Sequence, residues 1–194
     1  MLRRCIWILL IMFAVLIAGN RQAAAQDFPP IEVFGGFSAL SVGGPEDSIG
    51  NADRENVYGW QFSGAFNLTP VLGIVADFGG HYESFNDVPG IDIKVNSYEF
   101  LFGPRLNARG EKAAAFAHAL IGGTRGSLST SQGTIEGTSD NGFLLGLGGG
   151  IDWNVTESFG IRVLQFDWLP SRNEGEWSSK DVRYGFGVVY RFIN

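Results

Sequence analysis

Residues 58–68 read YGWQFSGAFNL, and large apolar residues alternate with small or polar ones throughout this stretch. The even positions carry Tyr, Trp, Phe, Gly, Phe and Leu, whereas the odd positions carry Gly, Gln, Ser, Ala and Asn. Successive side chains of a β-strand point to opposite faces of the sheet, so a period of two places all these aromatic residues on one face. The stretch therefore predicts a strand with one apolar and one polar face.

The same alternation recurs in residues 72–83, 97–106 and 182–192, and Thr69-Pro70 is typical of a turn between the first two strands. The apolar rows of the four strands begin at Tyr58, Leu72, Tyr98 and Val182. These rows hold 23 residues and no charged one, although 18% of the chain is charged. The facing rows carry the charges, which are Asp77, Glu83, Glu99, Arg105, Arg183 and Arg191. The two faces of each strand therefore meet different environments.

Four less regular stretches complete a set of eight strands. They cover residues 31–42, 113–125, 143–152 and 159–168. In the last of these, Arg162 falls in the same row as Leu164, Phe166 and Trp168 if the alternation is strict. Either a β-bulge shifts the alternation, or Arg162 lies near the edge of the apolar belt, where its head group can reach water.

The connections between the eight strands alternate in length. The short ones are Thr69-Pro70, 107–112 and 153–158, and the long ones, rich in Gly, Ser, Asn and acids, are 43–56, 84–92, 126–141 and 170–179. Short periplasmic turns and long extracellular loops are typical of outer-membrane barrels. The pattern predicts an all-β fold, an eight-stranded antiparallel up-and-down transmembrane β-barrel with both chain ends at the short-turn end.

The apolar rows are predicted to face outward. An eight-stranded barrel has an interior just wide enough for its own side chains, so it cannot hold 23 mostly large apolar residues from half of its strands. On a soluble calycin-like barrel, the rival fold, these rows would expose far more than the roughly 300–600 Å² of apolar patch usual for a monomer. In lipid the rows are favourable, and barrel closure leaves no strand edge unpaired.

The N-terminus has the features of an export signal. Arg3 and Arg4 precede an apolar run from Ile6 to Ala18, and Ala23-Ala24-Ala25 offers small residues for cleavage before Gln26. The run is 13 residues long, which is shorter than the roughly 20 residues of a membrane-spanning helix. A cleaved signal peptide is therefore expected.

We expect residues 1–25 to be the signal peptide and residues 26–194 to be one outer-membrane β-barrel domain. Cleavage removes three arginines and no acid, so the net charge changes from −6 to −9, which argues against nucleic-acid binding. The only cysteine, Cys5, lies in the signal, so no disulfide is expected. With His81 and His118 as the only histidines, a zinc site is not expected, and no cofactor motif is found.

The last predicted strand carries a recognisable motif, GFGVVYRF, in which alternate residues are Phe186, Val188, Tyr190 and Phe192. It resembles the terminal-strand signature that the outer-membrane assembly machinery reads, although Ile193 and Asn194 follow the final aromatic residue here. Over essentially the whole mature length, the chain resembles the OmpA-like/OmpX-like eight-stranded outer-membrane β-barrel family. The resemblance implies a monomer in the Gram-negative cell outer membrane, in contact with lipid and lipopolysaccharide.

The inward charged residues are predicted to form a polar network in the lumen, because a lone buried charge is costly. The members are Asp77, Glu83, Glu99, Arg105, Arg183 and Arg191. We expect them to plug the barrel, and the alternative is that they line a narrow polar conduit.

The two histidines are the candidates for enzymatic chemistry. His81 shares its row with Asp77 and Glu83, which could orient it, and the alternative is a histidine within the polar network. His118 could face lipid, with Ser127 nine residues further on, as in the serine–histidine pair of lipid A deacylases. Nothing else of that family's motif is present, so no catalytic residue is assigned.

The sequence therefore predicts a non-enzymatic outer-membrane barrel with a structural or surface-interaction role through its long loops. A narrow small-solute, porin-like channel is the alternative, and a lipid-modifying enzyme is a further one. The loop acids could contact divalent cations or basic partners, or simply form a solvated face: Glu46, Asp47, Asp53, Glu55, Asp87, Glu136, Glu174 and Glu176. The sequence identifies no external ligand.

Overall fold

The computed structural model describes residues 28–43, 55–88, 91–130, 133–134, 141–173 and 176–193, so the predicted signal peptide lies outside the described residues. Within these ranges, eleven strands form one sheet. The long strands are β1 (Ile31–Val42), β2 (Glu55–Asn67), β3 (Leu72–Val88), β4 (Ile91–Arg109), β5 (Ala113–Thr130), β7 (Asn141–Asn154), β8 (Phe159–Trp168) and β11 (Val182–Phe192). The short ones are β6 (Gly133–Thr134), β9 (Ser171–Asn173) and β10 (Glu176–Ser178).

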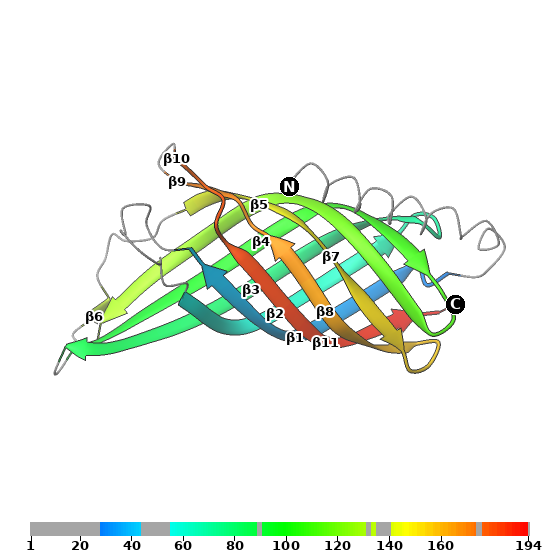
Figure 1. The fold of residues 1–194 in the computed structure, drawn as a ribbon, viewed down its shortest axis with the longest axis horizontal. Coiled ribbons are helices and arrows are strands. Elements are labelled where there is room, and N and C mark those ends of the chain that lie inside the picture. The colour runs from blue at the N-terminus through cyan, green and yellow to red at the C-terminus, as the bar shows by residue number, and fades with distance from the viewer. Residues whose placement is uncertain are drawn as a thin grey trace, which may run out of the picture.

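The eight long strands close into an antiparallel barrel, which confirms the predicted fold (Figure 1). Each strand pairs with the next, β11 pairs with β1, and β5 pairs with β7 across the β6 segment. Ile31 pairs with Phe192, so the start of β1 and the end of β11 lie side by side at the short-turn end. The three short strands lie at the opposite, loop end. No helix within the described ranges is long and apolar enough to cross a membrane.

Several strands extend further than the sequence predicted. Residues 84–92 and 126–141 were expected to be loops, but β3 continues to Val88, β4 starts at Ile91 and β5 continues to Thr130. These strands therefore form a wall that projects beyond the rest of the barrel (Figure 1). Polar residues can form strands here because the backbone N–H and C=O groups of β3, β4 and β5 hydrogen-bond to those of the neighbouring strand. Polarity alone cannot distinguish such strands from loops.

The aromatic rows face outward, as predicted. Phe62, Phe100 and Phe186 are 45%, 48% and 57% exposed, and exposed apolar side chains surround the whole barrel. Two residues of the predicted apolar rows depart from this pattern. Gly80 is buried, because the ring of Trp60 covers it. Val182 is buried, because it lies at the loop end of β11, where the barrel is covered by residues that follow β8.

A β-bulge in β8 explains the position of Arg162. Ile151 pairs with Leu164 but the next residue, Asp152, pairs with Arg162, so Val163 has no partner on β7. Val163 and Leu164 are both exposed, whereas Arg162 is 2% exposed. The extra residue reverses the alternation, so Arg162 points inward. Of the two explanations that the sequence allowed, the bulge is confirmed and a position of Arg162 at the edge of the apolar belt is wrong.

Candidate functional site

The barrel interior is the candidate site, because the inward rows bring together charged side chains from six of the eight long strands. The ion pairs of the described interior join five carboxylates and five guanidinium groups: Glu32, Asp77, Glu99, Asp152 and Asp167 with Arg105, Arg109, Arg162, Arg183 and Arg191. Their formal charges cancel. Arg109 has the most exposed side chain of this set, at 18%, and the other nine are nearly sealed from solvent.

A central cluster surrounds Arg183, whose side chain has no exposed surface. Arg183 Nη2 lies 2.7 Å from Asp77 Oδ1 and 2.8 Å from Asp167 Oδ2, and Nη1 lies 2.9 Å from Glu99 Oε2. One guanidinium fork thereby joins carboxylates from β3, β4 and β8 to β11. Such charge-assisted hydrogen bonds are the strong ones, and their geometry is fixed by the planar fork.

Both histidines extend this cluster. His118 Nε2 lies 2.7 Å from Asp167 Oδ1, and His118 is buried. His118 therefore does not take the lipid-facing position that the lipid A deacylase alternative required, and the serine–histidine pair on the lipid side is not formed. The apolar neighbours Phe116 and Leu120 misled the interpretation, because they too point inward.

Ser38, His81 and Glu99 have the order of a Ser–His–acid triad. Ser38 Oγ lies 2.9 Å from His81 Nε2, and His81 Nδ1 lies 3.3 Å from Glu99 Oε1. Ser38 and His81 are both 0% exposed, so a substrate has no access to the serine oxygen in this conformation. The arrangement therefore belongs to the polar network. Glu83, two residues beyond His81 on the same row, is half-buried.

A stack of four side chains crosses the interior. The guanidinium carbon of Arg105 lies 4.2 Å from the ring centroid of Phe116, and Arg162 lies 4.2 Å from the same ring and 4.2 Å from that of Phe34. The side chains come from β4, β5, β8 and β1, and β1 and β5 stand opposite each other in the ring of strands. Desolvated cation–π contacts contribute about 2 kcal/mol each, so the stack is a stable cross-wall.

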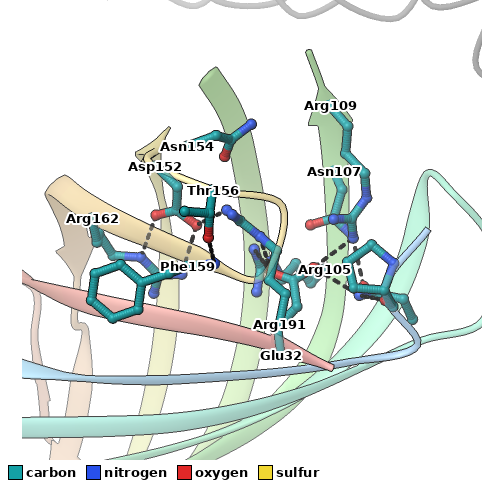
Figure 2. A network of polar contacts seen from close by, with 12 residues as sticks. Glu32, Arg105, Asn107, Arg109, Asp152, Asn154, Thr156, Phe159, Arg162 and Arg191 are labelled. Carbon is teal, nitrogen blue, oxygen red and sulfur yellow. Dashed lines mark hydrogen bonds and ion pairs between the residues drawn. The ribbon is translucent and has the colours of Figure 1, made fainter. Parts of the chain in front are cut away.

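A second polar cluster, the mouth cluster, lies at the short-turn end (Figure 2). Glu32 is its centre: Oε1 accepts hydrogen bonds from Arg109 Nη2 at 2.6 Å and Asn67 Nδ2 at 2.8 Å, and Oε2 lies 3.4 Å from Arg105. Asp152 accepts two hydrogen bonds from Arg162, at 2.8 and 3.2 Å. Arg191 stands between the two carboxylates, 3.8 Å from Glu32 and 3.6 Å from Asp152.

Apolar side chains fill the interior towards the loop end, which the sequence did not predict. They are Leu40, Leu101, Leu120, Leu144 and Leu169; the same buried cluster also includes Ala65 and Val75, which lie nearer the short-turn ends of β2 and β3, where Ala65 pairs with Glu32. A Cβ at Gly146 would lie 3.3 Å from both Leu101 Cδ1 and Leu120 Cβ. This glycine therefore leaves room for the leucines, and the cluster covers that end of the polar network.

Of the predicted lumen residues, Asp77, Glu99 and Arg183 meet in the central cluster, while Arg105 and Arg191 belong to the mouth cluster. Sequence reasoning missed Glu32, Arg109, Asp152, Arg162 and Asp167. A usable signal was present for Asp152 and Asp167, because a charged residue inside a predicted transmembrane strand has to point inward. Within the described residues, no group of three or more His, Cys, Asp or Glu side chains is arranged to hold a metal ion.

Comparison with known proteins identifies the fold. No protein-family profile and no curated protein sequence matches the chain. Among solved structures, Ail, the attachment invasion locus protein of Yersinia pestis, superposes with a TM-score of 0.57 at 19% identity, over 85% of this chain and 100% of that one. Ail has also been solved in complex with the heparin analogue sucrose octasulfate.

Two further structures give the same result. Neisserial surface protein A (NspA) superposes with a TM-score of 0.57 at 14% identity, over 84% of this chain and 97% of that one. The outer membrane protein OprG of Pseudomonas aeruginosa superposes with a TM-score of 0.51 at 12% identity, over 87% and 98%. At these identities the similarity establishes architecture and not activity. The chain therefore has the eight-stranded fold of the outer-membrane β-barrel proteins.

Proposed function

We propose that this protein is a non-enzymatic integral barrel of the Gram-negative outer membrane, exported by a cleaved signal peptide of residues 1–25, with a structural and surface-interaction role. The observation that carries the proposal is the combination of an exposed apolar exterior and a filled interior. The exterior requires lipid, since such a surface is far too large for a soluble monomer. In the interior, the charged groups bind one another, which supports a structural role for them.

The interior supports a structural barrel over a small-solute channel. From the short-turn end, a path for solutes would meet the mouth cluster, then the stack of Arg105, Phe116, Arg162 and Phe34, then the central cluster around Arg183, and finally the buried leucines. An eight-stranded barrel has little lumen to spare. Opening a path would require breaking buried ion pairs, at a cost of roughly 3–5 kcal/mol for each broken pair.

The long loops give the proposed surface role its chemical character. The four segments predicted as long loops, 43–56, 84–92, 126–141 and 170–179, contain ten acidic residues and two basic ones, Arg54 and Arg172, and two of these acids, Asp87 and Asp92, lie in the projecting ends of β3 and β4. The three short turns contain two of each sign. The loop end is therefore strongly acidic. A ligand such as the sulfated sugar bound to Ail would be repelled, so we propose cationic partners for these loops.

The C-terminal strand is proposed to carry the assembly signal. Phe186, Val188, Tyr190 and Phe192 all face outward and are 57%, 49%, 49% and 47% exposed. A row of apolar side chains on the outer surface is available to another protein before the barrel enters lipid. This supports recognition of the last strand by the assembly machinery.

Location and closure are tested together. Membrane fractionation with a gel run before and after boiling should place the protein in the outer membrane and show a mobility shift for the folded barrel. Planar-bilayer recording should show no discrete conductance steps. A protein found in the soluble periplasm without a shift would overturn the membrane location, and reproducible steps would favour the channel.

The loop role is tested with the protein embedded in neutral vesicles. Polylysine should bind in low salt and dissociate in high salt, whereas sucrose octasulfate should not bind. Substituting the loop acids Glu46, Asp47 and Asp53 by their amides should weaken polylysine binding. The matched control is the pair Glu111→Gln and Glu157→Gln in the short turns. Equal weakening by both sets would contradict the proposed loop surface.

A further inference from the structure

The mouth cluster holds more guanidinium groups than its carboxylates can pair. It contains Arg105, Arg109, Arg162 and Arg191 but, among the described residues, only Glu32 and Asp152 as ion-pair partners. The compensating carboxylates, Asp77, Glu99 and Asp167, are already bound around Arg183. Along β4, β8 and β11, Glu99, Asp167 and Arg183 lie further from the short-turn end than Arg105, Arg162 and Arg191 do.

The short contacts assign each mouth carboxylate to one arginine. Glu32 Oε1 is 2.6 Å from Arg109, and Asp152 binds Arg162 through both oxygens. Two arginines are left with long contacts only. Arg105 is 3.4 Å from Glu32 Oε2, and Arg191 is 3.8 Å from the same oxygen and 3.6 Å from Asp152.

Each of these arginines has a buried nitrogen without a hydrogen-bond partner, although Arg191 Nη2 is also the atom of the 3.6 Å ion pair with Asp152. Arg105 Nε and Arg191 Nη2 make no hydrogen bond, although Arg105 and Arg191 are only 4% and 5% exposed. A buried donor that is left unpaired costs about 1–3 kcal/mol, and more when it is charged. Since both side chains reach towards Glu32 Oε2, their head groups lie close enough to bind the same ligand.

The position of Arg191 leaves its guanidinium group able to contact such a ligand. Arg191 lies over Gly160 of β8, where a Cβ would come within 3.0 Å of Nη1 and 3.3 Å of Nη2. Asn107 and the partly exposed Arg109 line the same end of the barrel (Figure 2). Asn67 joins them there, since it donates to Glu32 and accepts from Asn107. A ligand would enter from the short-turn end, because the cation–π stack closes the other side.

We infer that the mouth cluster is a binding site for a phosphate-type oxyanion, gripped by Arg191 and Arg105. The planar fork of arginine matches the spacing of oxyanion oxygens. Water would satisfy the unpaired donors but would leave the local excess of two positive charges at the mouth, which the carboxylates around Arg183 balance only from a distance. A doubly charged phosphate group would neutralise it in place. The group can be inorganic phosphate or the terminal phosphoryl group of a larger periplasmic solute. The site lies at the opposite end from the acidic loops and is independent of their proposed role.

The test is calorimetric titration of the purified, folded protein in a non-ionic detergent, at constant ionic strength, low chloride and mildly alkaline pH. Inorganic phosphate should bind at one saturable site per chain and raise the thermal unfolding midpoint, since a ligand that binds only the folded state stabilises it. Glycerol phosphate is the second arm. Competition between the two assigns the site to terminal phosphoryl groups, and binding of inorganic phosphate alone assigns it to the free ion.

Arg191→Gln should weaken phosphate binding by about tenfold or more, the loss expected for a charge-assisted contact, and Arg191→Lys should weaken it less. The matched control is Arg172→Gln, an exposed arginine of β9 at the loop end, which should bind phosphate as the unmodified protein does. The mobility shift on boiling reports whether each variant is folded. The absence of saturable binding by the unmodified protein, or equal weakening by Arg172→Gln, would overturn the inference without affecting the proposed closed barrel.

Discussion

The guanidinium carbon of Arg162 lies 4.2 Å from the ring centroid of Phe116. This contact joins β8 to β5 across the interior, and Arg105 covers the other side of the same ring. A buried arginine with aromatic neighbours and a bidentate carboxylate partner, Asp152, is satisfied on all sides. The interior is therefore closed by specific contacts.

Phe116→Ala should strongly destabilise the barrel, because it removes the ring that separates two guanidinium groups and leaves a cavity. Truncating a buried phenylalanine costs about 3–5 kcal/mol. Without the ring between them, Arg105 and Arg162 also repel each other directly. The free energy of unfolding in lipid vesicles with urea measures the effect. The lipid-facing Phe102→Ala, on β4, is the control and should lose clearly less; an equal loss would contradict the stack.

Arg183→Gln should cost roughly 3–5 kcal/mol, because it leaves three buried carboxylates without their shared cation. The double variant Arg183→Gln with Asp167→Asn should recover part of the loss, since one of the stranded charges is removed. Urea unfolding of the two variants gives the difference. No recovery in the double variant would mean that the carboxylates are not coupled through Arg183.

Deleting Val163 should still give a folded barrel. Arg162 and Leu164 then follow each other directly, so β8 alternates regularly and every remaining residue keeps its face and its partner on β7. Deleting Phe166, which lies outside the bulge, makes Gln165 and Asp167 neighbours, so one side of β8 has to change face and a buried charged residue turns to lipid; an arginine at the bilayer midplane costs about 2–4 kcal/mol. The mobility shift on boiling should be kept by the first deletion and lost by the second, and the same result for both would contradict the bulge.

Spin labels placed at Phe62, Phe100 and Phe186 should be accessible to oxygen and protected from a water-soluble relaxation agent, because these positions face the acyl chains. A label at Val155, which is 53% exposed in a short turn, should show the reverse. Electron paramagnetic resonance saturation measures both accessibilities. Water contact at the three aromatic positions would show that the apolar rows do not face lipid.

The sequence by itself determined the eight strands, their order and the direction of their faces. Alternation with a period of two is a local property, so rows such as Tyr58–Leu68 identify both strand and outward face without knowledge of any partner strand. The same reasoning placed Asp77, Glu99, Arg105, Arg183 and Arg191 on the inward rows. It failed at Arg162 because one bulged residue reverses the phase, and residue types do not show where a bulge lies.

Only the tertiary structure decided which inward groups meet. Arg183 and Asp77 are 106 residues apart in the chain, and their contact depends on the register of the strands around the closed ring. Register also placed His118 beside Asp167 and left Arg105 and Arg191 without short carboxylate partners. Local alternation determines which face a side chain occupies, whereas pairing inside the barrel depends on the height of each residue on its strand. That height is set only when all eight strands hydrogen-bond together.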